Sequence, residues 1–318
     1  MSRGTSDYRH TERAARGTLL GHLLRPLTVP YFLREIWTQR FVHIQGEQAK
    51  FAELFSWSVL NSILEAQRFT AGRLKLVKET HLIEPRRYHY RPEHKLLVSA
   101  PALVEHLRAG ATLILNEVEV CHRPLRECAM ALEALFGVHV FVNLYAGFGH
   151  ERGFLRHWDS QDTLILQIAG RKDWKVWAPT RRWPLDPDVS EAPQPTGEPV
   201  WNGLLSEGAM FYIPRGWWHV ATPVDEPCLH LTVTIQNKTG LELLQWLMDR
   251  LRGEEVVRRD IPYLSSPEEQ QQHYGHLKRV VLESLRSLDF ADSAAAFREA
   301  HITEVVLPRP RFTLPQLD

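Results

Sequence analysis

The stretch LRHWDSQDTLILQIAGRKDWKVWAP, residues 155–179, decides the fold, because it reads as two β-strands joined by a tight turn. Apolar and aromatic residues fill both halves, and Gly170 stands between them where the chain must reverse. Lys172 and Trp174 are two positions apart, so an extended backbone places both side chains on one face. The first strand is preceded by two polar residues, His157 and Asp159, with the same spacing.

The neighbouring sequence has the same period of two. In VHVFVNLYA, residues 138–146, the valines and Leu144 alternate with Phe141, Asn143 and Tyr145. GAMFYIP and CLHLTVTIQ, residues 208–214 and 228–236, also read as strands. Several short strands separated by Gly and Pro turns are typical of an antiparallel sandwich or barrel. Together with the polar motifs they predict a double-stranded β-helix, the cupin or jelly-roll architecture.

Helical patterns flank this β-rich region. Residues 19–110 mix helix-like and strand-like pieces, and apolar residues recur at helical spacing from Arg123 to Phe136, where Gly137 supplies a stop. The pattern is helical again after Leu241. We therefore expect an α+β fold with N-terminal α/β elements, a β-helix core and a C-terminal helical region.

The domain boundaries follow from the same patterns. Residues 1–18 are expected to be a disordered tail, 19–240 the main domain, and 241–318 a helical region that ends in a proline-rich tail. Five prolines between Thr180 and Val200 predict a long solvated loop inserted in the barrel.

Composition restricts the classes of partner and compartment. The 38 basic and 38 acidic residues give a net charge of zero, so no overall field favours nucleic acid. The three cysteines form no CxxC pair, which favours a reducing, cytoplasmic environment. No apolar run approaches the ~20 residues that cross a bilayer, so a membrane is not expected as a partner. Because the net charge is zero, a nucleic acid is not expected as a partner either.

The polar pair before the first strand indicates a metal site. His157 and Asp159 lie on one face of an extended segment and can converge on one ion. His219 in IPRGWWHV, residues 213–220, follows a Pro-Arg-Gly turn at the start of a strand and offers a third ligand. Two imidazoles and one carboxylate form the facial triad of non-haem Fe(II) oxygenases, although zinc or manganese also fits this donor set.

The chain is similar to a known family at several motifs taken together: GATLILNEVEVCHRPLRECAMALEALFGV, VNLYAGFG, RHWDSQDTLILQIAGRKDWKVWAP and YIPRGWWHVATP with LHLTVTIQ. They resemble the Jumonji C ribosomal-oxygenase family, also described as cupin-4 proteins. The resemblance implies a hydroxylase of protein or peptide side chains that uses Fe(II), 2-oxoglutarate and O2.

The resemblance also implies roles for particular residues. The iron ligands, which make up the catalytic centre, fall on His157, Asp159 and His219. The basic residue that binds the far carboxylate of 2-oxoglutarate falls on Lys172, and an ammonium suits a dianion in an enclosed barrel. Three further positions that line the 2-oxoglutarate pocket fall on Asn143, Tyr145 and Thr232.

Substrate and assembly are expectations from the same resemblance. The helical region after Leu241 resembles a dimerisation unit, so a homodimer is expected, but it is short for the full C-terminal part of the ribosomal enzymes. Short relatives of this shape also resemble hydroxylases of ribosomally made natural-product peptides. The substrate is accordingly a precursor peptide or a ribosomal protein, and demethylation of N-methyl groups would use the same iron chemistry.

Two other functions fit parts of the sequence. A redox-inert metal cupin acting as a lyase or isomerase would use the three ligands but would give Lys172 no clear task. A non-catalytic Jumonji-type binding protein would have no physical reason to keep a costly polar cluster inside a barrel.

Overall fold

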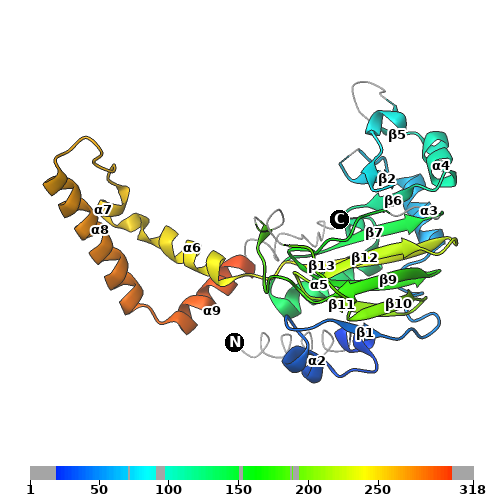
Figure 1. Ribbon diagram of the computed structural model, residues 1–318, viewed down its shortest axis with the longest axis horizontal. Coiled ribbons are helices and arrows are strands. Elements are labelled where there is room, and N and C mark those ends of the chain that lie inside the picture. Colours follow the sequence, from blue (N-terminus) through cyan, green and yellow to red (C-terminus); the bar gives the residue numbers. More distant parts are fainter. Residues whose placement is uncertain are drawn as a thin grey trace, which may run out of the picture. The chain divides into compact units, whose positions relative to one another are not determined.

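The computed structural model of the chain describes residues 19–70, 72–90, 97–149, 153–186, 188 and 193–302 (Figure 1). The predicted N-terminal tail, residues 1–18, and the proline-rich end from residue 303 lie outside these ranges. The chain divides into two compact units, Met1–Gln236 and Asn237–Asp318.

The first unit is built on an eight-stranded sheet in which every neighbouring pair is antiparallel. In spatial order its strands are β1 (Val42–Ile44), β11 (Met210–Ile213), β8 (Asp162–Ala169), β13 (Cys228–Ile235), β7 (Val140–Gly147), β6 (Thr112–Leu115), β2 (Leu74–Lys78) and β3 (His81–Leu82). The predicted strands in residues 138–146, 155–179, 208–214 and 228–236 are thereby confirmed.

A smaller sheet contains β10 (Trp201–Leu205), β9 (Lys172–Trp177) and β12 (Trp218–Pro223), again all antiparallel. The two sheets enclose a cluster of buried apolar side chains that come from both of them, namely Ile165, Trp174, Leu205, Ala209, Phe211 and Ile213. Apolar residues shared between two facing antiparallel sheets are the core of a jelly roll. The predicted double-stranded β-helix is therefore confirmed.

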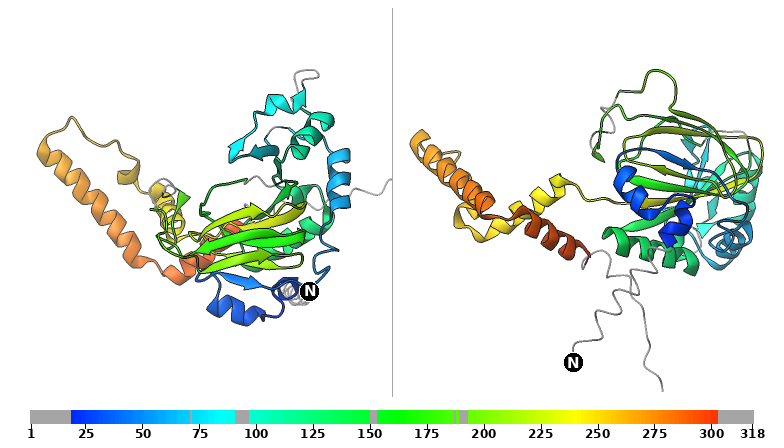
Figure 2. Two further views of the ribbon diagram at one scale, coloured as in Figure 1. Left: turned by 45° about the vertical axis from the view of Figure 1, so that its right-hand side comes forward. Right: turned by 90° about the horizontal axis from the view of Figure 1, so that it is seen from below.

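Helices cover the other face of the large sheet (Figure 2). They are α2 (Val29–Glu35), α3 (Trp57–Ala66), α4 (Ala100–Arg108) and α5 (Arg123–Phe136), joined by the short turns η1 (Pro85–Arg87) and η2 (Val118–Val120) and by the small hairpin of β4 (His89–Tyr90) and β5 (Leu97–Val98). Helix α5 ends at the predicted Gly137, which adopts the left-handed conformation with φ 71°. Their apolar faces share one core with β7, β8, β11 and β13.

The alternation of β7 sets up the site. Val140, Val142 and Leu144 are fully buried in the core under the helices. The residues between them, which include Asn143 and Tyr145, therefore point to the opposite face, toward the smaller sheet.

The second unit is helical and contains α6 (Gly240–Arg250), η4 (Leu251–Gly253), α7 (Glu255–Arg258), α8 (Pro267–Ser287) and α9 (Phe290–His301). Capping boxes begin two of these helices, with Thr239 and Glu242 at α6 and Ser266 and Glu269 at α8. Within the part of the chain that the structure describes, no helix is long and apolar enough to cross a membrane.

Candidate metal centre

Backbone pairing brings the predicted ligands together from distant parts of the sequence. The segment before β8 forms a β-bridge with β12, in which the His157 N–H donates to the His219 carbonyl at 3.1 Å and the reciprocal bond measures 2.7 Å. The turn before β12 is also tied to the segment that carries Asp159, because the Gly216 N–H donates to the Asp159 carbonyl at 2.9 Å. This turn has a φ of 83° at position 216, which glycine adopts without the strain that a side chain would cause.

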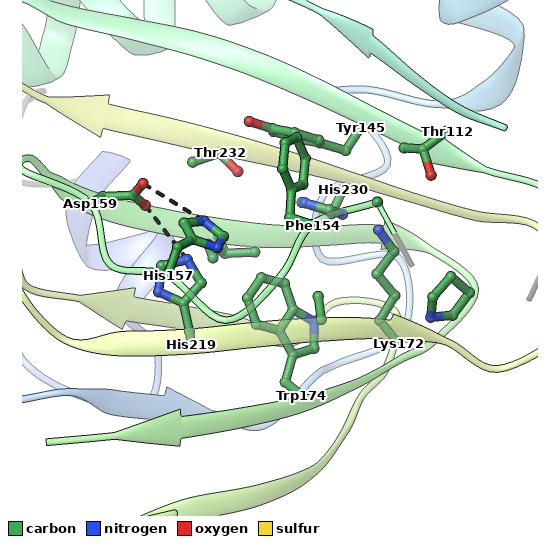
Figure 3. A pocket seen from close by; sticks show the side chains of 14 residues that line it. Thr112, Tyr145, Phe154, His157, Asp159, Lys172, Trp174, His219, His230 and Thr232 are labelled. Carbon is green, nitrogen blue, oxygen red and sulfur yellow. Dashed lines mark ion pairs between the residues drawn. The ribbon is translucent and has the colours of Figure 1, made fainter. Parts of the chain in front are cut away.

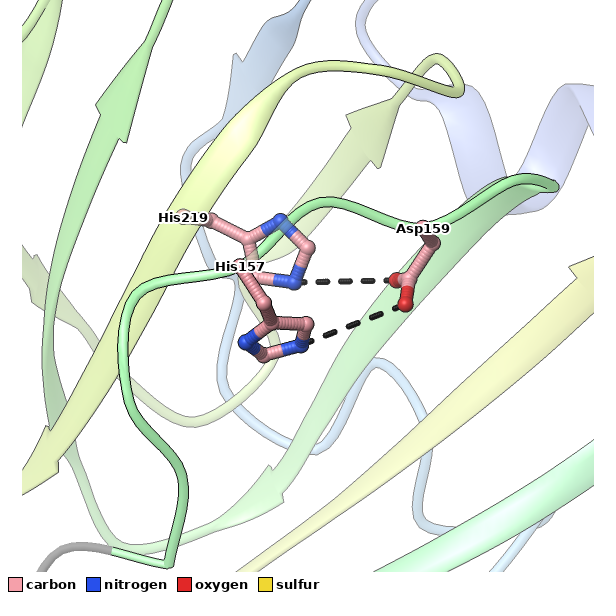
Figure 4. A group of neighbouring side chains, drawn as sticks. All are labelled: His157, Asp159 and His219. Carbon is pink, nitrogen blue, oxygen red and sulfur yellow. Dashed lines mark ion pairs between the residues drawn. The ribbon is translucent and has the colours of Figure 1, made fainter. Parts of the chain in front are cut away.

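The three side chains converge on one point (Figure 4). His157 Nε2 lies 3.9 Å from Asp159 Oδ1, and His219 Nε2 lies 3.6 Å from Asp159 Oδ2. The ligand atoms all lie within 4.8 Å of one another, and no other group of three or more His, Cys, Asp or Glu in the described residues does so. A single ion bound at about 2 Å by each atom spans such separations.

The two histidines are oriented in the same way. His157 Nδ1 lies 2.8 Å from the Leu155 carbonyl, and His219 Nδ1 lies 3.1 Å from the Trp217 carbonyl. A carbonyl accepts only from a protonated nitrogen, so each Nε2 keeps its lone pair on the side of Asp159. This outer hydrogen bond is the usual device by which proteins orient a metal-binding imidazole.

The centre is closed on one side and open on the other. The side chain of His219 is 5% exposed, whereas those of His157 and Asp159 are each 41% exposed. Burial is the main cause that lowers the pKa of His219 to about 4, and His157 lowers it further while Asp159 raises it. His219 is therefore neutral at physiological pH, which is the form that binds a metal.

A cavity of about 290 Å³ extends from the triad into the barrel (Figure 3). Besides the three candidate ligands it is lined by Thr112, Tyr145, Gly153, Phe154, Ile165, Lys172, Trp174, Ala221, Pro223, His230 and Thr232. Three of the four residues predicted to bind a co-substrate, Tyr145, Lys172 and Thr232, thus share one cavity with the triad.

Lys172 lies at the buried end of this cavity, only 5% exposed. Burial lowers the pKa of its ammonium, and the nearby Cys228 opposes this effect. Tyr145 is the converse case, because burial, followed by the Asp159 carboxylate, raises the pKa of its hydroxyl. The phenol remains protonated and can donate a hydrogen bond.

Asn143 is the one predicted site residue that is not among those lining the cavity. It lies opposite Thr232 in the register of β7 and β13, and its side-chain oxygen accepts a hydrogen bond of 3.2 Å from the Glu117 N–H. This bond holds the turn at Glu117, whose φ is 53°. The role in co-substrate binding that the resemblance implies for Asn143 stays a prediction.

The cavity also contains side chains that the sequence did not single out as site residues. Thr112 lies within the motif that begins GATLIL, and Phe154 lies two residues before RHWDSQD, but nothing in either segment marks these two side chains as part of a site. His230 shares a strand face with Thr232, and this spacing was the signal available for it.

Comparison with known proteins finds a matching domain family and similar curated sequences. Residues 118–243 match the model of a JmjC domain. The bifunctional lysine-specific demethylase and histidyl-hydroxylase NO66 of Drosophila pseudoobscura pseudoobscura is 28% identical over 243 residues, which are 74% of this chain and 25% of that protein. Ribosomal oxygenase 1 of Bos taurus is 30% identical over 240 residues, 73% of this chain and 35% of that protein. The chain thus spans only a quarter to about a third of the length of these curated relatives.

Among solved structures, the fold matches YcfD, a ribosomal oxygenase from Escherichia coli, in complex with cobalt and 2-oxoglutarate. The TM-score is 0.53 at 19% sequence identity, and the match covers 82% of this chain and 68% of YcfD. A second YcfD structure, in complex with cobalt and succinic acid, also gives a TM-score of 0.53. At this level of identity the likeness concerns the fold.

Proposed function

Because this chain belongs to the JmjC, ribosomal-oxygenase-like family, we propose that it is an Fe(II)- and 2-oxoglutarate-dependent oxygenase that hydroxylates a side chain of a peptide or protein. One observation carries the proposal: the facial triad and a buried lysine line the same cavity. A redox-inert cupin accounts for the triad but not for an ammonium held out of water at the far end.

The donor set fits a divalent iron. His157, Asp159 and His219 would hold the ion on one face and leave the remaining positions to the co-substrate and O2. Because backbone carbonyls already align both imidazoles, their side chains lose little conformational freedom when the metal binds. Zinc or manganese satisfies the same donors, so the choice of iron depends on the rest of the cavity.

The rest of the cavity fits a dicarboxylate. Lys172 would pair with the carboxylate far from the metal, and Tyr145 and Thr232 would add hydrogen bonds from β7 and β13. Among the residues that the structure describes, no carboxylate forms an ion pair with the buried Lys172 ammonium, and an arriving carboxylate would offset the cost of burying its charge. With 2-oxoglutarate and O2, the iron would supply the oxidation that turns a substrate C–H into C–OH, with succinate and CO2 as co-products.

The open side of the triad is the expected place for the peptide or protein. His157 and Asp159 are partly exposed, and Phe154 and Leu155 beside them are 40% and 67% exposed. Of the relatives, one is named as both a demethylase and a histidyl-hydroxylase and another as a ribosomal oxygenase. A protein or ribosomally made peptide side chain is accordingly the proposed substrate class, and a nucleic acid is not.

Assembly, domain division and location complete the proposal. Residues 19–240 would form the JmjC catalytic domain and residues 241–318 a dimerisation-like region. Helix α8 has no buried residue in the single chain, and the exposed apolar side chains in α6, α8 and α9 include Leu241, Leu244, Leu282 and Phe290. These features support a homodimer, which light scattering would test.

The three free cysteines support a cytoplasmic location.

The first test needs no substrate. Fe(II) and 2-oxoglutarate are added anaerobically to metal-free protein, and the visible charge-transfer band of chelated 2-oxoglutarate is recorded. The band should appear with the wild type and disappear with His157→Ala. Metal binding without a band would favour the redox-inert cupin, and absence of metal binding would favour the non-catalytic protein.

A further inference from the structure

The strand pairing that leads toward the ligand on β12 ends just before the metal centre. Strands β8 and β11 pair as far as Thr163 and Ile213. The chain then makes the turn at residues 214–217, and His219 follows two residues later. The position of this ligand therefore depends on what holds the turn where the pairing of the sheet has ended.

The side chain of Asp162 holds the turn at this point. Asp162 is the first residue of β8, next to Thr163, and it is 1% exposed. Its Oδ1 accepts from the Arg215 N–H at 3.0 Å. The next N–H of the turn, that of Gly216, donates to the Asp159 carbonyl at 2.9 Å. Two successive N–H groups of the turn are thus bound by the segment that carries the carboxylate ligand.

The second oxygen of the same carboxylate fixes its orientation. Asp162 Oδ2 accepts from the Tyr212 hydroxyl at 2.6 Å, and this hydroxyl accepts from the Thr38 N–H at 2.7 Å. Burial, followed by the Asp162 carboxylate, raises the pKa of Tyr212, so the phenol keeps the proton that it donates. The Tyr212 ring packs against Phe32 and Trp37, with centroids 5.0 Å and 5.4 Å away. The carboxylate is therefore bound to a residue that the N-terminal part of the chain holds in place.

A carboxylate is the side chain that suits this position. A buried carboxyl group costs free energy unless its oxygens accept hydrogen bonds. A carboxylate has two acceptor oxygens and no donor, which matches a hydroxyl donor on one side and a backbone N–H on the other. Hydrogen bonds to an ionised acceptor are also shorter and stronger than neutral ones. Asp162 can therefore link the barrel wall firmly to the turn.

We infer that Asp162 is a positioning residue for the metal centre, because its carboxylate holds the turn that places His219 beside the other two ligands. Asp162 does not line the cavity, so it acts through the backbone of the turn and touches neither metal nor co-substrate. This inference rests on the proposed function and deepens it. It explains how the ligand on β12 keeps its distance from the two ligands that precede β8.

The test compares two buried carboxylates of the first unit. Glu133 on α5 is 0% exposed and accepts from the Val140 N–H at 3.1 Å in the core under the helices, so it is the matched control. Each carboxylate is changed to its amide, in Asp162→Asn and Glu133→Gln, and to alanine, in Asp162→Ala and Glu133→Ala. Calorimetric titration of Co(II) into metal-free protein measures Kd, and the visible absorption of bound Co(II) reports its ligand geometry. Urea denaturation of the metal-free protein measures stability.

All four variants should lose stability, but only those at Asp162 should change the metal centre. Asp162→Ala should raise the Kd for Co(II) by about ten- to a hundredfold, the usual effect of losing an outer residue that orients a metal ligand. The bridge to His157 also holds His219, so binding should not be abolished. Asp162→Asn keeps one oxygen for the Arg215 N–H, so its Kd should lie only about two- to tenfold above that of the wild type. The Co(II) spectrum should change in the same order, and both Glu133 variants should match the wild type.

Other results overturn the inference in distinguishable ways. If Asp162→Ala binds Co(II) as tightly as the wild type and with the same spectrum, Asp162 only stabilises the core. Equal weakening in the Glu133 variants would mean that any loss of stability disturbs the site. If Asp162→Ala does not fold, Asp162→Asn against Glu133→Gln decides by the same criteria. If the wild type itself binds no Co(II), the proposed function is wrong, and the inference is lost with it.

Discussion

Replacing Lys172 by methionine should change co-substrate binding and protein stability in opposite directions. Methionine has a similar length and no charge, so Lys172→Met removes the ammonium and leaves the cavity filled. Removing one partner of a buried charge pair typically costs about 3–5 kcal/mol. At 1.4 kcal/mol per factor of ten, the Kd for 2-oxoglutarate should rise by roughly a hundredfold to a few thousandfold.

The metal-loaded but co-substrate-free protein should respond differently. Burial lowers the pKa of Lys172 from its usual 10.5 in the folded state, so the unfolded chain binds that proton more tightly. Stability therefore increases as the pH rises from the folded pKa toward 10.5, and it is reduced below that window. Lys172→Met should abolish this increase and should be at least as stable as the wild type at neutral pH.

The assay pairs Lys172→Met with Arg171→Met. Arg171 is the adjacent residue, but its guanidinium is half exposed and forms an ion pair of 2.9 Å with Glu226. Calorimetric titration of 2-oxoglutarate into each cobalt-loaded variant measures Kd, and urea denaturation at several pH values measures stability. If Lys172→Met binds as tightly as the wild type, or if Arg171→Met weakens binding as much, Lys172 is not the charge partner of the co-substrate.

Three further substitutions test the scaffold, two of them in the first unit and one in the helical second unit. Gly216→Ala should weaken Co(II) binding by about tenfold and lower stability by about 1–3 kcal/mol, since φ is 83° and an added Cβ would lie 2.6 Å from Pro184 Cδ; metal titration and urea denaturation measure the two effects. Tyr212→Phe should cost about 1–3 kcal/mol in urea denaturation, because its hydroxyl donates to the Asp162 carboxylate at 2.6 Å in the core. Ser266→Ala should destabilise α8 by about 1 kcal/mol, as loss of a capping side chain usually does, and circular dichroism during urea denaturation would show it.

The glycine and serine substitutions each have a matched control. Gly275→Ala, in helix α8 with nothing within 4 Å of the added Cβ, should stabilise the protein by about 1 kcal/mol and leave metal binding unchanged. Ser265→Ala should have little effect, because the Ser265 carbonyl, not its side chain, accepts from Gln270. Equal losses at Ser265 and Ser266 would contradict the capping argument, and a fully stable Gly216→Ala variant would contradict the argument from strain.

The sequence best predicts those elements in which the order of polar and apolar residues matches the burial of the side chains. Strand β7 alternates between core and cavity, and the first residues of β9 alternate between cavity and outer surface, so both strands show a period of two in the sequence. Helix α5 ends at a glycine that adopts positive φ. The sequence does not predict strand β10, residues Trp201–Leu205, because only Leu205 is fully buried and Asn202 and Gly203 interrupt its apolar residues. Its place in the sheet follows from pairing with β9, which local sequence does not record.

The site shows the same division. The spacing of His157 and Asp159 is local, but the bridge between His157 and His219 joins segments 62 positions apart and depends on the whole barrel. Asn143 illustrates the limit, because the face it occupies follows from alternation while its bond to the Glu117 N–H depends on a turn in another segment. A residue's face can thus be read from sequence, but its hydrogen-bond partner cannot.

The gradient of burial along the cavity connects the proposed chemistry to the fold. At one end His157 and Asp159 are partly exposed, and at the other Lys172, Trp174 and His230 are almost completely enclosed between the two sheets. For the proposed function, we therefore predict that the co-substrate enters past the triad with its charged far end first. We also predict that it binds before the peptide, since a peptide over His157 and Asp159 would cover the exposed side of the triad.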